Sequence, residues 1–108
     1  MIVRIWTTKF DPARLDELDT FANRISRPVL RRQPGNQGVL FAADGDEWIT
    51  LTLWKDAASV ARLDHSTDYQ ETVAKILAAG FLKDEQITRT YDDHGGDIAL
   101  PATNPSPA

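Results

Sequence analysis

The chain has 108 residues, of which 42% are hydrophobic and 26% are charged, so it is long enough for one hydrophobic core and too short for two. Twelve basic residues against sixteen acidic ones give a net charge of -4, which argues against nucleic acid or an anionic membrane as the main partner. The absence of cysteine excludes a disulfide, a thiolate metal site and a cysteine nucleophile.

The N-terminal residues 2–9 alternate between two sets of side chains, as a β-strand with two unlike faces does. They lack the long apolar run of a signal peptide, and no segment has the length of a transmembrane helix, so we expect a cytoplasmic protein. Asp11 and Pro12 then supply a helix cap and a proline at the first helical position. Pro28 should bend this first helix or end its regular part near Arg27. Its apolar stripe is Leu15, Leu18, Ala22, Ile25 and Val29.

A β-hairpin and a second helix follow the first helix. Residues 39–43 and 47–54 are predicted strands, and the sequence Asp-Gly-Asp at 44–46 is a hairpin turn signal between them. The second helix opens after Trp54 with Asp56 as its cap. Residues 66–68 re-cap it, where Thr67 and Gln70 have capping-box spacing. The helix stops at Gly80, and residues 86–91 form a short fourth strand.

The order β-α-β-β-α-β predicts an α+β, ferredoxin-like domain over residues 1–92, with a four-stranded antiparallel sheet and both helices on one face. Residues 93–108 form a Gly/Pro-rich tail with little to bury. The sheet face away from the helices carries either an aliphatic set of side chains or a Trp/Thr set, and neither can be left to water. We therefore expect a homodimer that packs through this sheet face.

Three stretches of the sequence carry a resemblance to a known family. They are the segment Leu-Arg-Arg-Gln-Pro-Gly at 30–35, the strand end Leu-Thr-Leu-Trp at 51–54, and His65-Ser66 with Tyr69 in the helix that follows. Together they resemble the antibiotic biosynthesis monooxygenase superfamily of dimeric α+β barrels, from about residue 1 to residue 91. The resemblance implies the fold, and it implies a cofactor-independent oxidation for part of the family.

Two subgroups of that family have site residues that can be matched to positions of this chain. The haem-degrading members use an Asn, a Trp and an axial His, and the matching positions here are Trp6, Leu63 and Val73, which offer no iron ligand. Members that oxidise polyketide anthrones to quinones use Asn, Trp, Tyr and Arg. Trp54 matches the Trp, and the other three positions fall on Thr50, Val60 and Ala74. The resemblance therefore implies no haem and no other cofactor.

Two groups of residues are candidates for a functional site. One would lie on a single face of two strands and, if that face looks toward the helices, form an aromatic pocket for a planar phenolic ligand: Arg4, Trp6, Thr50, Thr52 and Trp54. The alternative is that the tryptophans are core and the threonines are strand formers. The other group is His65 and Tyr69, one helical turn apart, which could act as a base and a hydrogen-bond donor or be a surface His and a packed Tyr.

Other chemistries find little support in the sequence. Asp92, Asp93 and His94 are consecutive and point different ways, so a solvated turn is expected and no metal is predicted. Ser59 and Ser66 lack a paired base or a Gly-rich elbow, so no serine hydrolase is indicated.

Two functions remain open. In the first, the protein is a small cofactor-independent monooxygenase that acts on an aromatic or polyketide-like molecule. Trp6 and Trp54 would form the walls and His65 would be the base, with oxyanion donors at Arg4, Thr50 and Tyr69. In the second, it is a non-catalytic ligand-binding or accessory dimer that keeps the family cavity without its chemistry.

Overall fold

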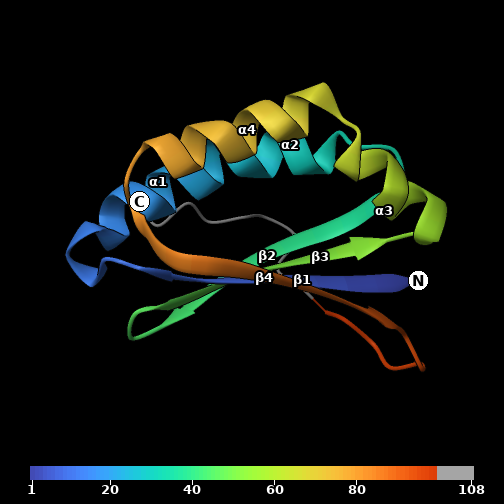
Figure 1. Ribbon diagram of the computed structural model, residues 1–108. Coiled ribbons are helices and arrows are strands. Elements are labelled where there is room, and N and C mark those ends of the chain that lie inside the picture. The colour runs from blue at the N-terminus through green and yellow to red at the C-terminus, as the bar shows by residue number, and fades with distance from the viewer. Residues whose placement is uncertain (100–108) are drawn as a thin grey trace.

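A four-stranded antiparallel sheet forms one layer of the protein and the helices form the other (Figure 1). The computed structural model describes residues 1–99, apart from the side chain of Asp84. The strands are β1 (Ile2–Phe10), β2 (Asn36–Asp44), β3 (Glu47–Trp54) and β4 (Leu82–Asp92), in the order β2-β3-β1-β4. This order confirms the predicted ferredoxin-like fold. The bounds of β3 are those predicted, whereas β2 and β4 extend beyond the predicted strands at both ends.

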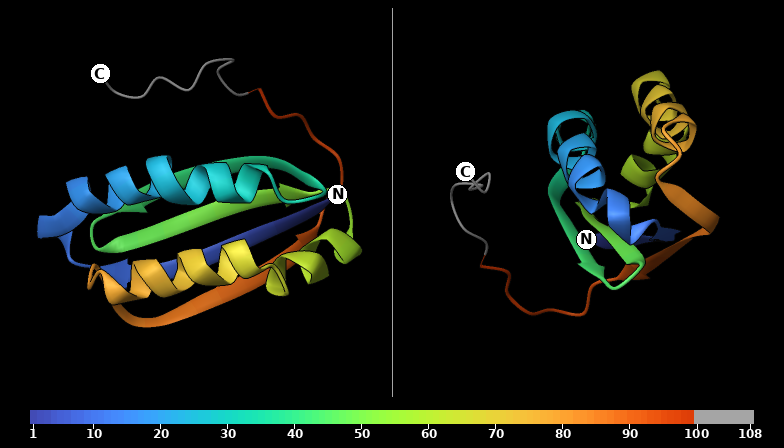
Figure 2. Two further views of the ribbon diagram at one scale, coloured as in Figure 1. Left: turned by 90° about the horizontal axis from the view of Figure 1, so that it is seen from above. Right: turned by 90° about the vertical axis from the view of Figure 1, so that its left-hand side faces the viewer.

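Both helical segments lie on the same face of the sheet, and they form two separate ridges over it (Figure 2). The first segment consists of η1 (Pro12–Arg14), α1 (Leu15–Phe21), η2 (Ala22–Ser26) and α2 (Arg27–Arg31). The second consists of α3 (Ala57–Asp64) and α4 (Thr67–Ala78). In the described part of the chain, no helix or strand covers the opposite face of the sheet. No helix within residues 1–99 has the length and hydrophobicity needed to cross a membrane.

The first helical segment continues through Pro28, and its irregular turn lies just before this residue. η2 is one turn of π-helix, and the Arg27 amide donates to the carbonyl oxygen of Ala22, five residues back. A proline in an α-helix lacks one donor and collides with the carbonyl four residues earlier, which here is that of Arg24. Widening the turn relieves this collision, and α2 then runs on to Arg31. The prediction that the regular helix bends or ends near Arg27 corresponds to this π-turn. The helix does not end there, because α2 follows it directly.

The second helical segment is two helices joined at a short turn. The Asp56 carboxylate caps α3 by accepting from the Ser59 amide at 2.9 Å. α3 ends at Asp64, and the Ser66 hydroxyl caps α4 by accepting from the Tyr69 amide at 3.3 Å. The predicted caps at Asp56 and within 66–68 are confirmed. The Thr67–Gln70 capping box is wrong, because Ser66 is the cap.

The strand register decides which side chains share a face. Trp6 pairs with Thr50, and Arg4 with Thr52, so the tryptophan and threonine set faces the helices together. The aliphatic set, which includes Ile5 paired with Leu51, faces away. Buried side chains under the helices form two clusters, one around Phe10, Leu18, Ala22, Trp48, Ile76 and Phe81 and one around Leu30, Trp54 and Leu63. Of the predicted tail at 93–108, residues 100–108 lie outside the described residues.

Candidate functional site

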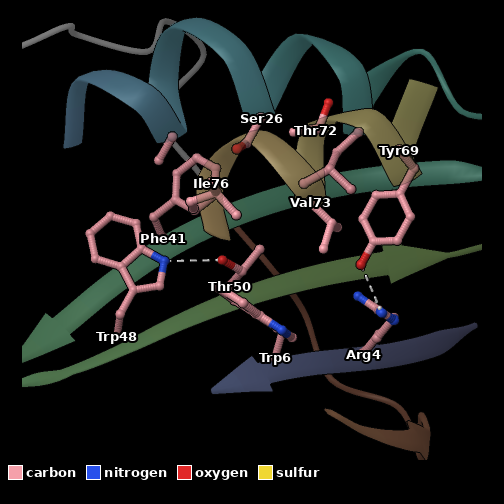
Figure 3. A pocket seen from close by; sticks show the side chains of 12 residues that line it. Arg4, Trp6, Ser26, Phe41, Trp48, Thr50, Tyr69, Thr72, Val73 and Ile76 are labelled. Atoms are coloured by element: carbon pink, nitrogen blue, oxygen red, sulfur yellow. Dashed lines mark hydrogen bonds between the residues drawn. The ribbon is translucent and has the colours of Figure 1, made fainter. Parts of the chain in front are cut away.

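A cavity lies between the two helical ridges and the sheet (Figure 3). The empty space within it, including its open mouth, is about 500 Å³. β1 and the β2–β3 hairpin supply its floor, and the first helical segment and α4 supply its walls. The lining residues are Arg4, Trp6, Ala22, Ser26, Leu30, Phe41, Trp48, Thr50, Tyr69, Thr72, Val73 and Ile76.

A buried cation and a phenol lie together at one end of the cavity. Arg4 is 7% exposed, and its Nη2 donates to the hydroxyl oxygen of Tyr69 at 3.1 Å. Its guanidinium carbon lies 5.6 Å from the centre of the Tyr69 ring. Among the described side chains no carboxylate lies within 4 Å of this guanidinium, and Arg4 is the one charged residue in the lining. The cation is therefore buried with a neutral partner, which is an unusual arrangement unless a ligand completes it.

The other end of the cavity is aromatic. The rings of Phe41 and Trp48 are 5.6 Å apart, and Trp6 lies on the floor between them and Arg4. The Trp48 indole N–H donates to the Thr50 hydroxyl oxygen at 3.1 Å, so the proton of that hydroxyl can be donated elsewhere. Planar aromatic walls with a few polar groups suit a flat aromatic ligand.

The structure brings four of the seven predicted site residues together. Arg4, Trp6, Thr50 and Tyr69 all line the cavity. Thr52 and Trp54 lie on the same sheet face and are fully buried, but they do not line the cavity. The Trp54 indole donates to the Thr52 hydroxyl oxygen at 2.7 Å, and Trp54 belongs to the core cluster with Leu30 and Leu63. The sequence did not decide which face of the sheet forms the pocket. It is the Trp/Thr face, and its second tryptophan is Trp48 and not Trp54.

His65 does not join this group. It is exposed, it does not line the cavity, and its amide donates to the Arg62 carbonyl oxygen at the end of α3. The one-turn spacing to Tyr69 assumed a single continuous helix. The chain turns at Ser66 instead, so His65 belongs to the end of α3 and Tyr69 to the first turn of α4. The expected shared face of these two side chains is wrong for this reason.

Several lining residues were missed by sequence reasoning. Trp48 has the same strand parity as Thr50, so extending the alternation by two residues would have found it. Phe41 pairs with Thr50 across the hairpin, and the hairpin turn fixes that register. Ser26 enters the lining from the π-turn, which the sequence did not predict.

Outside the cavity, Asp93 and Asp56 each have a structural partner. Asp93 pairs with the N-terminal amine at 2.9 Å, and the hydrogen bond from this amine lowers the pKa of its carboxyl. The pKa of Asp56 is also lowered, first by the hydrogen bond from the Ser59 hydroxyl and then by that from the Ser59 amide. Within residues 1–99, no three His, Cys, Asp or Glu side chains are grouped to hold a metal ion.

Comparison with known proteins identifies the fold. No family model and no curated protein matches the chain. A crystal structure of an antibiotic biosynthesis monooxygenase matches with a TM-score of 0.71 and 14% identity, over 88% of this chain and 100% of the other. A monooxygenase of Streptomyces coelicolor, solved in complex with nanaomycin D, matches with a TM-score of 0.72 and 16% identity, over 92% of each chain. SnoaB, a cofactor-independent oxygenase from Streptomyces nogalater, matches with a TM-score of 0.69 and 11% identity, over 88% of this chain and 94% of its own. The predicted resemblance is confirmed at the level of the fold.

Proposed function

We propose that the protein is a small cofactor-independent monooxygenase that oxidises an aromatic, electron-rich molecule bound in the cavity. The observation that carries the proposal is the buried Arg4–Tyr69 pair at the end of an aromatic cavity. The fold is shared with a monooxygenase and with a cofactor-independent oxygenase, which supports the reaction class without fixing it.

The chemistry needs an electron-rich anion. Organic molecules react slowly with oxygen because the two differ in spin state, so a cofactor-free enzyme must stabilise a substrate anion that can give up an electron. In an anthrone-type substrate a methylene carbon becomes a carbonyl: the carbon loses two hydrogens and gains one oxygen atom, and the second oxygen atom leaves as water. The carbon supplies all four electrons, so no separate reductant is required. Arg4 and Tyr69 would stabilise the anion, and Trp6, Phe41 and Trp48 would exclude water.

A second function is favoured by one feature of the cavity. Among the described residues, its lining includes no histidine and no carboxylate that could remove a proton from carbon. A binding or accessory protein would need the same aromatic walls and the same cation without a base.

Oxygen uptake separates these two functions. Wild-type protein is mixed with hydroxylated anthrones, naphthols and flavonols, with a protein-free blank for spontaneous oxidation. We expect uptake above the blank, reduced at least about tenfold in Trp6→Ala and about a hundredfold in Tyr69→Phe, on the scale of losing one oxyanion donor. Arg32→Gln, which alters an exposed side chain that pairs with Asp68, should keep full activity. Fluorescence quenching without oxygen uptake would leave the binding function. Loss of turnover in His65→Ala would indicate that the exposed His65 imidazole acts as the base.

We also propose that the protein is a homodimer that packs through the uncovered sheet face. Three large apolar side chains on this face are substantially exposed: Leu40 at 45%, Ile87 at 54% and Tyr91 at 47%. Ile5 and Leu51 lie between them on the central strands, and Arg89 lies beside Ile5 on β4, between Ile87 and Tyr91. A second copy would cover it by two-fold symmetry.

Two leucines of equal exposure test the dimer. Leu40 on the uncovered face and Leu77 on α4 are 45% and 46% exposed. Leu40→Asp should shift micromolar protein toward monomer in sedimentation equilibrium, because a carboxylate would be buried in the interface, while Leu77→Asp should not. A wild-type monomer at every concentration, or equal behaviour of the two variants, would contradict the proposal.

A further inference from the structure

The polar groups of the cavity indicate the charge of its ligand. We infer that the cavity takes a planar aromatic molecule as its anion, an ionised enol or phenol, with the charged oxygen on Arg4 and Tyr69. This inference rests on the proposed function for the kind of molecule and adds its ionisation state. It concerns binding, so it can be tested apart from turnover.

Two groups support a negatively charged oxygen at this end of the cavity. Arg4 is 7% exposed as a residue, its guanidinium is a cation with donors on every nitrogen, and its hydrogen-bond partner among the described side chains is a neutral phenol. The Tyr69 hydroxyl accepts from Arg4, so its own proton is available to be donated to another acceptor. Both groups therefore offer donors, and an anionic oxygen would accept from both in charge-assisted hydrogen bonds.

The rest of the lining fits the same ligand. The Thr50 hydroxyl accepts from the Trp48 indole and keeps a proton to donate. Thr50 pairs with Trp6, one step along the floor of the cavity from the pair of Arg4 and Thr52. An aromatic molecule with a second oxygen, such as a quinone carbonyl, would meet this donor while its ring lies against Trp6. Arg4 is the one charged group among the described lining residues, so a neutral ligand would leave this cation without a counter-charge and a cationic ligand would be repelled.

A matched pair of ligands tests the inference. 2-Hydroxy-1,4-naphthoquinone is ionised at pH 7, and 2-methoxy-1,4-naphthoquinone has the same ring without the acidic proton. The chain contains no cysteine, so these quinones have no thiol to modify. Titration calorimetry should show the hydroxy compound binding about ten- to a hundredfold more tightly, as expected of hydrogen bonds to a charged group. This preference should fade as the pH falls through the ionisation of the ligand. Unsubstituted 1,4-naphthoquinone, which is smaller and neutral, should bind like the methoxy compound.

Variants of Arg4 test whether the preference for the anionic ligand depends on this residue. Arg4→Met should bind all three compounds equally, Arg4→Lys should keep part of the preference, and Arg32→Met should behave as wild type. Thermal unfolding checks that each variant is folded. Equal binding of the three compounds by wild type, or a preference that persists in folded Arg4→Met, would overturn the inference. A clear anion preference without oxygen uptake supports it and removes the monooxygenase function. Turnover of neutral substrates without any anion preference would overturn the inference and support the monooxygenase function.

Discussion

Gly35 is the position at which a single methyl group should damage this fold most clearly. The residue follows α2 in a left-handed conformation, with φ of 84°. A Cβ atom there would lie 2.0 Å from the hydroxyl oxygen of Ser59 and 2.5 Å from its Cβ. Ser59 is fully buried, and its hydroxyl donates to the Asp56 carboxylate at 2.7 Å and accepts from Arg62 at 3.1 Å. Ser59 therefore cannot move without breaking the cap of α3.

The cost of Gly35→Ala has two parts. The left-handed backbone costs a residue with a side chain about 1–2 kcal/mol. Forcing the methyl group against Ser59 adds about 1–3 kcal/mol of overpacking. Gly45→Ala is the matched control, because Gly45 has φ of 60° and nothing within 4 Å of its Cβ position. We expect a loss of about 2–5 kcal/mol at Gly35 and of about 1–2 kcal/mol at Gly45.

Urea unfolding followed by tryptophan fluorescence measures both variants. A double variant, Gly35→Ala with Ser59→Gly, should recover part of the loss at Gly35, since the colliding side chain is gone and the two changes are in contact. If Gly35→Ala costs no more than Gly45→Ala, the contact with Ser59 does not constrain the loop, and the reasoning fails.

Three further changes have defined outcomes. Trp54→Ala should lower the free energy of unfolding by about 3–5 kcal/mol in the same assay, because its ring is completely buried; a loss below 1 kcal/mol would contradict this. Hydrogen bonds from Ser59 lower the pKa of Asp56, so the ionised cap stabilises the fold above about pH 4 and is lost as the pH falls through the lowered pKa. Asp56→Ala should therefore destabilise at pH 7, and the difference from wild type should shrink in acid; a constant difference would contradict this. Arg4→Met should raise the free energy of unfolding by about 1–4 kcal/mol, as replacing buried charges by apolar side chains often does, and a loss would contradict this.

The fold could be predicted because its signals are local and agree with one another. Alternation along residues 47–54 defined β3 to the residue, and the turn at 44–46 fixed its antiparallel partner. The Asp56 cap located the start of α3. Each of these signals depends on neighbours in the sequence, so one chain is enough to read them.

The site could be predicted only in part, because it depends on how separate elements meet. Strand parity placed Arg4, Trp6 and Thr50 on one face correctly. The π-turn that brings Ser26 to the cavity results from the clash of Pro28 with a carbonyl four residues earlier, and a proline in a sequence does not say whether the helix will break, bend or widen. The turn at Ser66 separated His65 from Tyr69, although their spacing suited one helix.

The position of Arg4 shows where stability and function compete in this chain. On β1 the side chains that face the helices are Ile2, Arg4, Trp6, Thr8 and Phe10, and an apolar residue in place of Arg4 would extend the core without a desolvation cost. Arg4 is 7% exposed, and its guanidinium receives one hydrogen-bond partner, which is neutral, in exchange for the water it has lost. Such a cation is disfavoured in the free protein and is compensated when an anionic oxygen binds beside it. The same residue should therefore lower the stability of the empty protein and raise its affinity for an anion, so that Arg4→Met changes the two properties in opposite directions.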